Sequence, residues 1–173
     1  MPVYALGDIA PQIHPDAFVH PDAIVIGHVT IGAEASIWPG AVLRGDEDPG
    51  IHIGARTSIQ DGAVLHVTDE LPTRVGDNCV IGHIAHLEGC TIEQLALVGS
   101  GSVVLHAAVV RSGGVVGANA VVPNRMEVPP GMMALGIPAK LRPSTMDVEY
   151  IRNGAAEYVE RCRRFRAELR RLT

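Results

Sequence analysis

Two histidines and a glutamate that lie close together in the sequence have the residue types of a catalytic metal site. They are His66, His83 and Glu88, and His86 lies in the same stretch. Two imidazoles and a carboxylate that leave a fourth position open form a typical catalytic zinc set. Three solvated polar side chains on a wall are the simpler interpretation, so the fold must decide whether they can meet.

The element that must position these side chains is a repeat of six residues. An aliphatic residue recurs at this spacing, and a small residue follows most of them four positions later. A period of six fits neither an α-helix nor an alternating strand, but it fits a coil with three flat sides. We count about eighteen units, or about six turns of an all-β solenoid over residues 13–127. The aliphatic positions are Ile13, Val19, Val25, Ile31, Ile37, Leu43, Ile53, Ile59, Leu65, Val75, Ile81, Leu87, Ile92, Val98, Val104, Val110, Val116 and Val122.

This register predicts that His66 lies beside Glu88. Leu65 and Leu87 are three units apart, which is one turn, so they stack inside the coil and the next residue of each points outward. Neighbouring strands are about 4.8 Å apart. His83 lies near a corner of the same coil as Glu88 and faces away from this column. It can join the site only if a second subunit brings its own His83, which a threefold arrangement would do three times.

Two segments, residues 44–50 and 67–74, interrupt the repeat. Solenoids tolerate insertions at their corners, and such excursions often build the functional site while the coils hold it in position. Residues 1–12 are expected to be a lead-in to the coils.

The C-terminal part of the chain is predicted to close the solenoid and then form a helix. Residues 128–143 contain several prolines and are expected to be extended. Ser144 and Asp147 form a capping box at the start of a stretch with a helical apolar stripe. We therefore expect a β-helix domain with its closing segment at 1–143 and a helix packed on it at 144–173.

The composition argues against several classes of function. The net charge of −5 argues against a nucleic-acid partner, for which a basic stripe is expected. Apolar stretches are too short to span a membrane, and the N-terminus has no signal pattern, so we expect a cytoplasmic protein without a membrane partner. Cys79, Cys90 and Cys162 lack metal or redox spacing, which favours reduced thiols.

Four strings of the sequence form a set: IWPGAVLRGD at 37–46, SIQDGAVLH at 58–66, IGH at 81–83 and LGIPAK at 135–140. Together they resemble the γ-class carbonic anhydrase-like family over nearly the whole chain. The QDGAVLH string one coil before GH is the more specific part, because hexapeptide acyltransferases share the repeat and the closing string. The resemblance implies a left-handed parallel β-helix and a homotrimer that reversibly hydrates carbon dioxide to bicarbonate.

The resemblance also implies a metal centre. In that family zinc, iron or cobalt is bound between subunits by three histidines, and two of these fall on His66 and His83. The third falls five residues after GH, where this chain has Glu88. Three alternatives stay open: Glu88 is a ligand, His86 takes its place from a position about 6–7 Å further along the strand, or the site has lost its metal.

Further residues receive roles from the same resemblance. Arg44 and Asp61 match a pair that joins neighbouring subunits by a salt bridge near the metal, a task that suits a planar guanidinium. Gln60 matches a residue that orients the metal-bound water. Glu47 falls near a proton-handling glutamate. Asp46 matches the family motif, although it could equally cap its loop.

The implied activity is that of a carbonic anhydrase, a lyase, which is weak or lost in many proteins of this kind. The metal lowers the pKa of a bound water, and the resulting hydroxide attacks carbon dioxide. One alternative is an acyltransferase or thioesterase that acts on a CoA ester, with His106 as its catalytic histidine. The other is a non-catalytic metal-binding or assembly protein, for which Glu88 in the third ligand position is the main argument.

Overall fold

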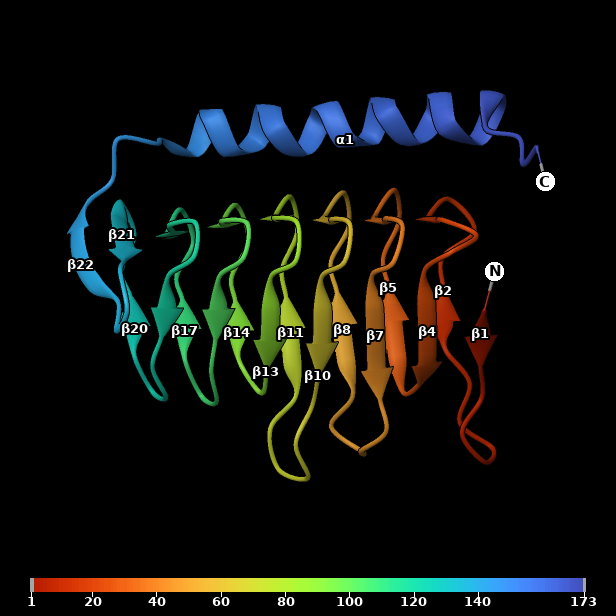
Figure 1. The fold of residues 1–173 in the computed structure, drawn as a ribbon, viewed down its shortest axis with the longest axis horizontal. Coiled ribbons are helices and arrows are strands. Elements are labelled where there is room, and N and C mark those ends of the chain that lie inside the picture. The colour runs from red at the N-terminus through yellow and green to blue at the C-terminus, as the bar shows by residue number, and fades with distance from the viewer. Residues whose placement is uncertain (1, 173) are drawn as a thin grey trace.

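The computed structural model describes residues 2–172 and shows a three-sided parallel β-solenoid of about seven turns. Each coil contributes short strands to three sheets, and one helix runs along the stack (Figure 1). This confirms the predicted left-handed β-helix of hexapeptide repeats with a C-terminal helix. The solenoid begins earlier than predicted, because Val3 and Tyr4 already pair with the next coil. Met1 and Thr173, the outer ends of the predicted domains, lie outside the described residues.

The chain visits the three sheets in the same order in each turn. Sheet 1 consists of β1 (Val3–Tyr4), β4 (Ile24–Gly27), β7 (Val42–Gly45), β10 (Val64–His66), β13 (His86–Glu88), β16 (Val103–Val104) and β19 (Val121–Val122). Sheet 2 consists of β2 (Gln12–Ile13), β5 (Val29–Ile31), β8 (Ile51–Ile53), β11 (Thr73–Val75), β14 (Thr91–Ile92), β17 (Val109–Val110) and β20 (Glu127–Val128). Sheet 3 consists of β3 (Phe18–Val19), β6 (Ser36–Ile37), β9 (Ser58–Ile59), β12 (Val80–Ile81), β15 (Leu97–Val98), β18 (Val115–Val116), β21 (Met132–Leu135) and β22 (Lys140–Pro143).

The core is a stack of equivalent positions from successive coils. Leu43, Leu65 and Leu87 pair in register across sheet 1, and all three are fully buried. The small residues Ala63 and Ala85 are also buried, where the walls converge. Burial of a leucine side chain stabilises the fold by about 1.5–3 kcal/mol. Because successive side chains on a strand point to opposite faces, this register also fixes which side chains point outward from the solenoid.

The solenoid ends in a hairpin, and the helix follows. β22 pairs antiparallel with β21, and α1 (Val148–Glu168) begins five residues after β22. The predicted capping box at Ser144 is wrong. Asp147 itself caps α1 by accepting a hydrogen bond from the Tyr150 backbone N–H at 2.8 Å, whereas the Ser144 hydroxyl bonds to the backbone of Met146.

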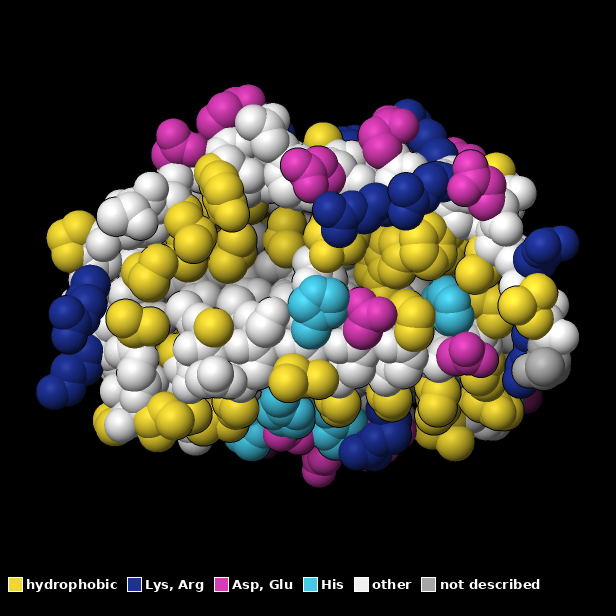
Figure 2. Space-filling view, turned by 45° about the horizontal axis from the view of Figure 1, so that its top comes forward, with side chains coloured by type: hydrophobic (Ala, Val, Ile, Leu, Met, Phe, Trp, Pro, Cys, Tyr) yellow, Lys and Arg dark blue, Asp and Glu magenta, His cyan; other side chains and the backbone are white. Residues whose placement is uncertain are grey.

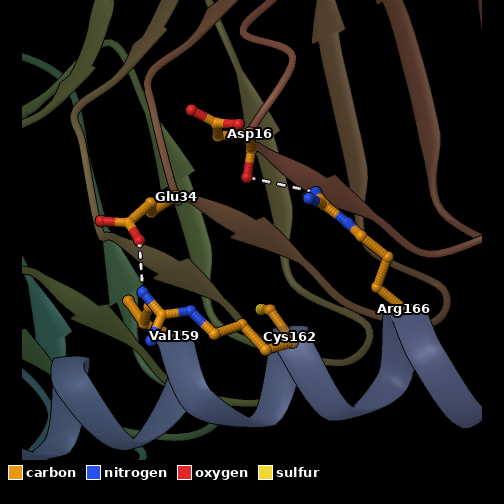
Figure 3. Close-up of a pocket in the computed structure, with 6 residues that line it drawn as sticks. Asp16, Glu34, Val159, Cys162 and Arg166 are labelled. Carbon is orange, nitrogen blue, oxygen red and sulfur yellow. Dashed lines mark hydrogen bonds and ion pairs between the residues drawn. The ribbon is translucent and has the colours of Figure 1, made fainter.

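α1 packs lengthwise on the solenoid (Figure 1). Its buried residues are Ile151, Ala155, Val159 and Cys162, and Cys162 packs with Phe18 and Trp38 of sheet 3 and its corner. The pocket beside Cys162 is spanned by structural contacts (Figure 3): Arg163 pairs with Glu34 at 2.8 Å, and Arg166 donates to the Asp16 carbonyl at 3.1 Å. These contacts hold the helix in place. No helix among the described residues is long and apolar enough to cross a membrane.

Both excursions leave the solenoid at one corner, between sheets 1 and 2, on the side away from α1 (Figure 1). They are shorter than predicted and comprise residues 46–50 and 67–72. Arg44 remains in β7 because it pairs in register with His66, and Arg74 remains in β11 because it pairs with His52.

Candidate functional site

Sheet 1 separates the predicted site residues into two groups at its opposite edges. The group at or just beyond the carboxyl ends of β7, β10 and β13, called the His66 edge below, comprises Arg44, Asp46, Glu47, His66 and Glu88; His86, the first residue of β13, contacts Glu88. The group at the corner that leads from sheet 3 into sheet 1, called the His83 edge below, comprises Gln60, Asp61 and His83; Ile84, which was not a predicted site residue, lies beside them.

The register predicted for the His66 edge is confirmed. Arg44, His66 and Glu88 occupy consecutive rungs of sheet 1. His66 Nδ1 lies 2.8 Å from Glu88 Oε1, and His66 Nε2 lies 2.8 Å from Asp46 Oδ1. The second oxygen of Asp46 accepts a hydrogen bond from Arg44. The excursion after β7 therefore folds back and places the Asp46 carboxylate against the His66 imidazole, so Asp46 does more than cap its own loop.

Glu88 is the centre of a histidine cluster. Its second oxygen, Oε2, lies 3.3 Å from His86 Nε2 and 3.4 Å from His106 Nε2. The His106 contact lacks hydrogen-bond geometry. Sequence reasoning missed this approach, although the register contained the signal: Leu87 pairs with Val104, which places His106 one coil beyond Gly89. Figure 2 shows histidine and acidic side chains gathered along the lower edge of the molecule.

These contacts stabilise the ionised carboxylates. The hydrogen bond from His66 lowers the pKa of Glu88, and it outweighs the opposing effect of burial with help from His86 and His106. Burial raises the pKa of Asp46, but hydrogen bonds from His66 and the backbone, with the charges of His66 and Arg44, bring it below its ordinary value. Both groups are therefore available as anions to hold a cation or an imidazolium.

The His83 edge is more open. His83 Nδ1 lies 3.0 Å from Asp61 Oδ2, and both side chains are about half-exposed. Gln60 is buried at the same corner, where its backbone N–H donates to the Ile81 carbonyl on the next coil. Glu47, in contrast, is exposed on the excursion of the opposite edge.

The two edges do not meet within one chain. His83 lies in the turn that precedes β13, whereas Glu88 is the last residue of β13, so the strand lies between them. Arg44 and Asp61 likewise lie on opposite edges, each with a partner in its own chain. Within residues 2–172, no group of three or more His, Cys, Asp or Glu side chains is arranged to hold a metal ion.

The cysteines contribute no reactive group. Cys79, Cys90 and Cys162 are free and buried, and burial raises the pKa of Cys79 and of Cys90 to about 12. A thiol with such a pKa is protonated near neutral pH and is a poor nucleophile and metal ligand.

Comparisons with known proteins agree with this architecture. A family model described as bacterial transferase hexapeptide (six repeats) matches residues 10–45. The chain is 41% identical over 160 residues to gamma carbonic anhydrase 2, mitochondrial, of Arabidopsis thaliana; the match covers 88% of this chain but only 57% of that protein. It is 37% identical to the carnitine operon protein CaiE of a Proteus species, across 100% of this chain and 90% of CaiE.

A solved structure agrees as well. The hexapeptide transferase family protein from Anaplasma phagocytophilum superposes with a TM-score of 0.89 at 34% identity, and the match covers 95% of this chain and 98% of that one. The near-complete matches to this structure and to CaiE extend the likeness over all coils and the helix. The chain thus belongs to the γ-class carbonic anhydrase-like family of hexapeptide-repeat proteins.

Proposed function

We propose that this protein is a trimeric metalloenzyme of carbonic anhydrase type that hydrates carbon dioxide to bicarbonate. The observation that carries the proposal is the placement of His66 and Glu88 on one edge of sheet 1 and of His83 on the other. A threefold assembly with these edges in contact would complete three equivalent sites. Each site would use His66 and Glu88 of one subunit and His83 of the partner subunit. The cytoplasmic location expected from the sequence stays a prediction.

The donor atoms fit a divalent metal, zinc first and iron or cobalt as alternatives. Imidazole and carboxylate are zinc ligands, and a ligating histidine usually donates its other ring N–H to a carboxylate or a carbonyl. His83 has this arrangement, because Nδ1 faces Asp61 and leaves Nε2 as the donor atom. At His66, Nδ1 faces Glu88, and Asp46 is placed to accept from Nε2. Asp46 is thus a positioning residue for His66.

When bound, a divalent metal lowers the pKa of a coordinated water toward neutrality. The remaining tasks fall to side chains of this chain. Gln60 is buried on the His83 edge, so it would enter the shared site with His83 and orient the attacking water by hydrogen bonding. Glu47, exposed on the opposite edge, would pass the released proton to solvent. Water and carbon dioxide thereby become bicarbonate and a proton.

Glu88 is the third ligand in this proposal, and His86 is the alternative. The carboxylate of Glu88 lies next to His66 on the neighbouring rung, and three imidazoles face it. His86 comes from two residues earlier on the strand and reaches toward Glu88. It would therefore orient the carboxylate and leave the coordination to Glu88.

The shared site can be tested by mixing two inactive variants. His66→Ala and His83→Ala each damage every site of a homotrimer, but each mixed trimer regains one intact site of three. Equal amounts, unfolded together and refolded, should recover about one quarter of the wild-type sites. Zinc per subunit, measured by elemental analysis, and carbon dioxide hydration should recover in the same proportion.

The control is the double variant His66→Ala/His83→Ala mixed with wild type. This mixture also forms mixed trimers, but each contact between a double-variant and a wild-type subunit lacks one of the two histidines. Zinc should therefore be bound only where two wild-type subunits meet. If the two single variants do not complement, or if either keeps its metal alone, the shared site is wrong. A stable monomer in light scattering at micromolar concentration would also overturn it.

A second candidate function is acyl transfer from a CoA ester to an acceptor, or hydrolysis of that ester, with CoA released as the free thiol. It rests on the match to the hexapeptide transferase model and on His106, which lies 3.4 Å from a Glu88 oxygen. Titration of acetyl-CoA by calorimetry separates the two functions, since the hydratase predicts no saturable binding. If metal binding and both activities were absent, a non-catalytic assembly role would remain.

A further inference from the structure

One corner of the His83 edge has an unusual residue. Its column contains Gly40, Gly62, Ile84, Gly101 and Asn119 on successive coils, and all five have positive φ. Glycine and asparagine tolerate this conformation, whereas a β-branched side chain does so at a cost in free energy. Among the described residues with positive φ, Ile84, at 52°, is the only β-branched one.

Burial of the Ile84 side chain within its own chain does not offset this backbone strain. The side chain is 67% exposed. The neighbouring coils leave space for it, since a Cβ added to Gly62 would lie 3.0 Å from Ile84 Cγ2, and one added to Gly101 would lie 3.9 Å from Cδ1. Ile84 therefore projects as a single apolar knob between two glycines.

The knob stands directly beside the ligand that the other subunit would receive. Ile84 follows His83, and its backbone N–H donates to the Asp61 carbonyl at 2.8 Å. The Asp61 side chain holds the His83 ring. Any surface that accepts His83 must therefore meet Ile84 as well.

We infer that Ile84 is an intersubunit knob that packs against the partner's His66 edge and forms an apolar wall of the shared site. The inference rests on the proposed function for the identity of the partner surface. Backbone strain persists where contacts with the surrounding structure hold the residue in its strained conformation. In the trimer, contacts with the second subunit would hold Ile84 in this way. An apolar wall suits a small uncharged substrate such as carbon dioxide and excludes water from one side of the site.

The test compares four variants in the metal-free and zinc-loaded protein. Ile84→Gly and Ile84→Asn relieve the backbone strain but remove the apolar knob, whereas Ile84→Leu keeps its volume. Leu95→Gly is the matched control, because Leu95 also has positive φ, at 56°, but lies at the corner between sheets 2 and 3. The dissociation constant of the trimer is measured by sedimentation equilibrium.

We expect Ile84→Gly and Ile84→Asn to raise the dissociation constant at least about tenfold, because the apolar contact is lost at each interface. Ile84→Leu and Leu95→Gly should change it by less than about threefold. A purely structural role predicts the reverse, with unchanged assembly and a higher melting temperature for the glycine and asparagine variants. That result would overturn the inference.

The outcome also separates this inference from the proposed function. If wild type hydrates carbon dioxide and Ile84→Gly leaves both assembly and rate unchanged, the inference fails and the function stands. If Ile84→Gly dissociates the trimer while zinc-loaded wild type shows no hydration, the knob stands and the hydratase function fails. A monomeric wild type overturns both.

Discussion

The two edges of sheet 1 present site residues in different ways. At the His66 edge, His66 and Glu88 are 21% and 26% exposed and contact each other and further charged side chains. At the His83 edge, His83 and Asp61 are 51% and 48% exposed and contact each other. Neighbouring coils of one chain organise both edges, but the side chains of the His83 edge are more exposed to solvent. In the proposed trimer, the shared site would be complete only after the two edges of neighbouring subunits meet.

The largest expected effect comes from a cavity in the core of the solenoid, on which both edges of sheet 1 rest. Leu87→Ala empties a fully buried position on β13, and the free energy of unfolding should fall by about 2–5 kcal/mol. Val64→Ala, at a side chain that is 38% exposed on the same sheet, should cost less than about 1 kcal/mol. Urea unfolding at one protein concentration measures both. Equal costs would contradict the assignment of Leu87 to the core that carries the two edges.

The next effect concerns the third ligand. Glu88→Gln should weaken zinc binding at least about tenfold, because a neutral amide is a poorer ligand than a carboxylate. Glu88→His should retain or improve zinc binding and raise carbon dioxide hydration, whereas His86→Ala should change zinc binding little. Competition with a chelating dye measures the affinities. If His86→Ala strips the metal and Glu88→Gln does not, His86 is the ligand instead.

The proposed contact between the edges of neighbouring subunits predicts energetic coupling between residues that lie far apart within one chain. Arg44→Ala and Asp61→Ala alter residues on opposite edges, so within one chain their effects on stability should add. If they form a salt bridge between subunits, the double variant should deviate from additivity by about 0.5–3 kcal/mol. A double-mutant cycle on trimer dissociation measures this energy. Strict additivity would remove the salt bridge from the proposal.

The smallest expected effect is the contribution of the Asp46 carboxylate, on the His66 edge, to stability at acid pH. The folded-state pKa of Asp46 lies below its ordinary value of 3.8, so its contribution to stability is present above that value and is lost as pH falls through the lower, folded pKa. Asp46→Asn should therefore flatten the loss of stability below about pH 4 and lower stability by a constant amount above about pH 5. Urea unfolding between pH 3 and 7 tests this. A parallel pair of stability curves would contradict the role of the Asp46 carboxylate.

The spacing of six residues was sufficient to predict the solenoid, because each aliphatic position must fall inside and each successor outside. The same register predicted His66 beside Glu88 without reference to any relative. The boundaries were less predictable. Arg44 and Arg74 look like excursion residues, but rung pairing keeps both in strands.

The side-chain partners of the site could not be predicted from spacing alone. Asp46 reaches His66 because the excursion folds back, and the shape of an insertion is set by tertiary contacts. The Asp61–His83 pair and the approach of His106 to Glu88 depend on rotamers at corners, where the repeat specifies the backbone and not the side chain. The strain at Ile84 likewise appears only once φ is known.

The helix α1 also determines the order in which this chain can fold. Arg163 pairs with Glu34 across 129 residues of sequence, and Arg166 reaches the Ala17 carbonyl across 149. Coil-to-coil contacts such as Arg56 with Asn78 span only 22 residues. Short loops close at a lower entropic cost than long ones, so coils can form one after another during synthesis. The contacts of α1 with the first coils can form only after the C-terminal residues have been made. The first coils, with Phe18 and Trp38 still uncovered, are therefore the aggregation-prone surface of the nascent chain.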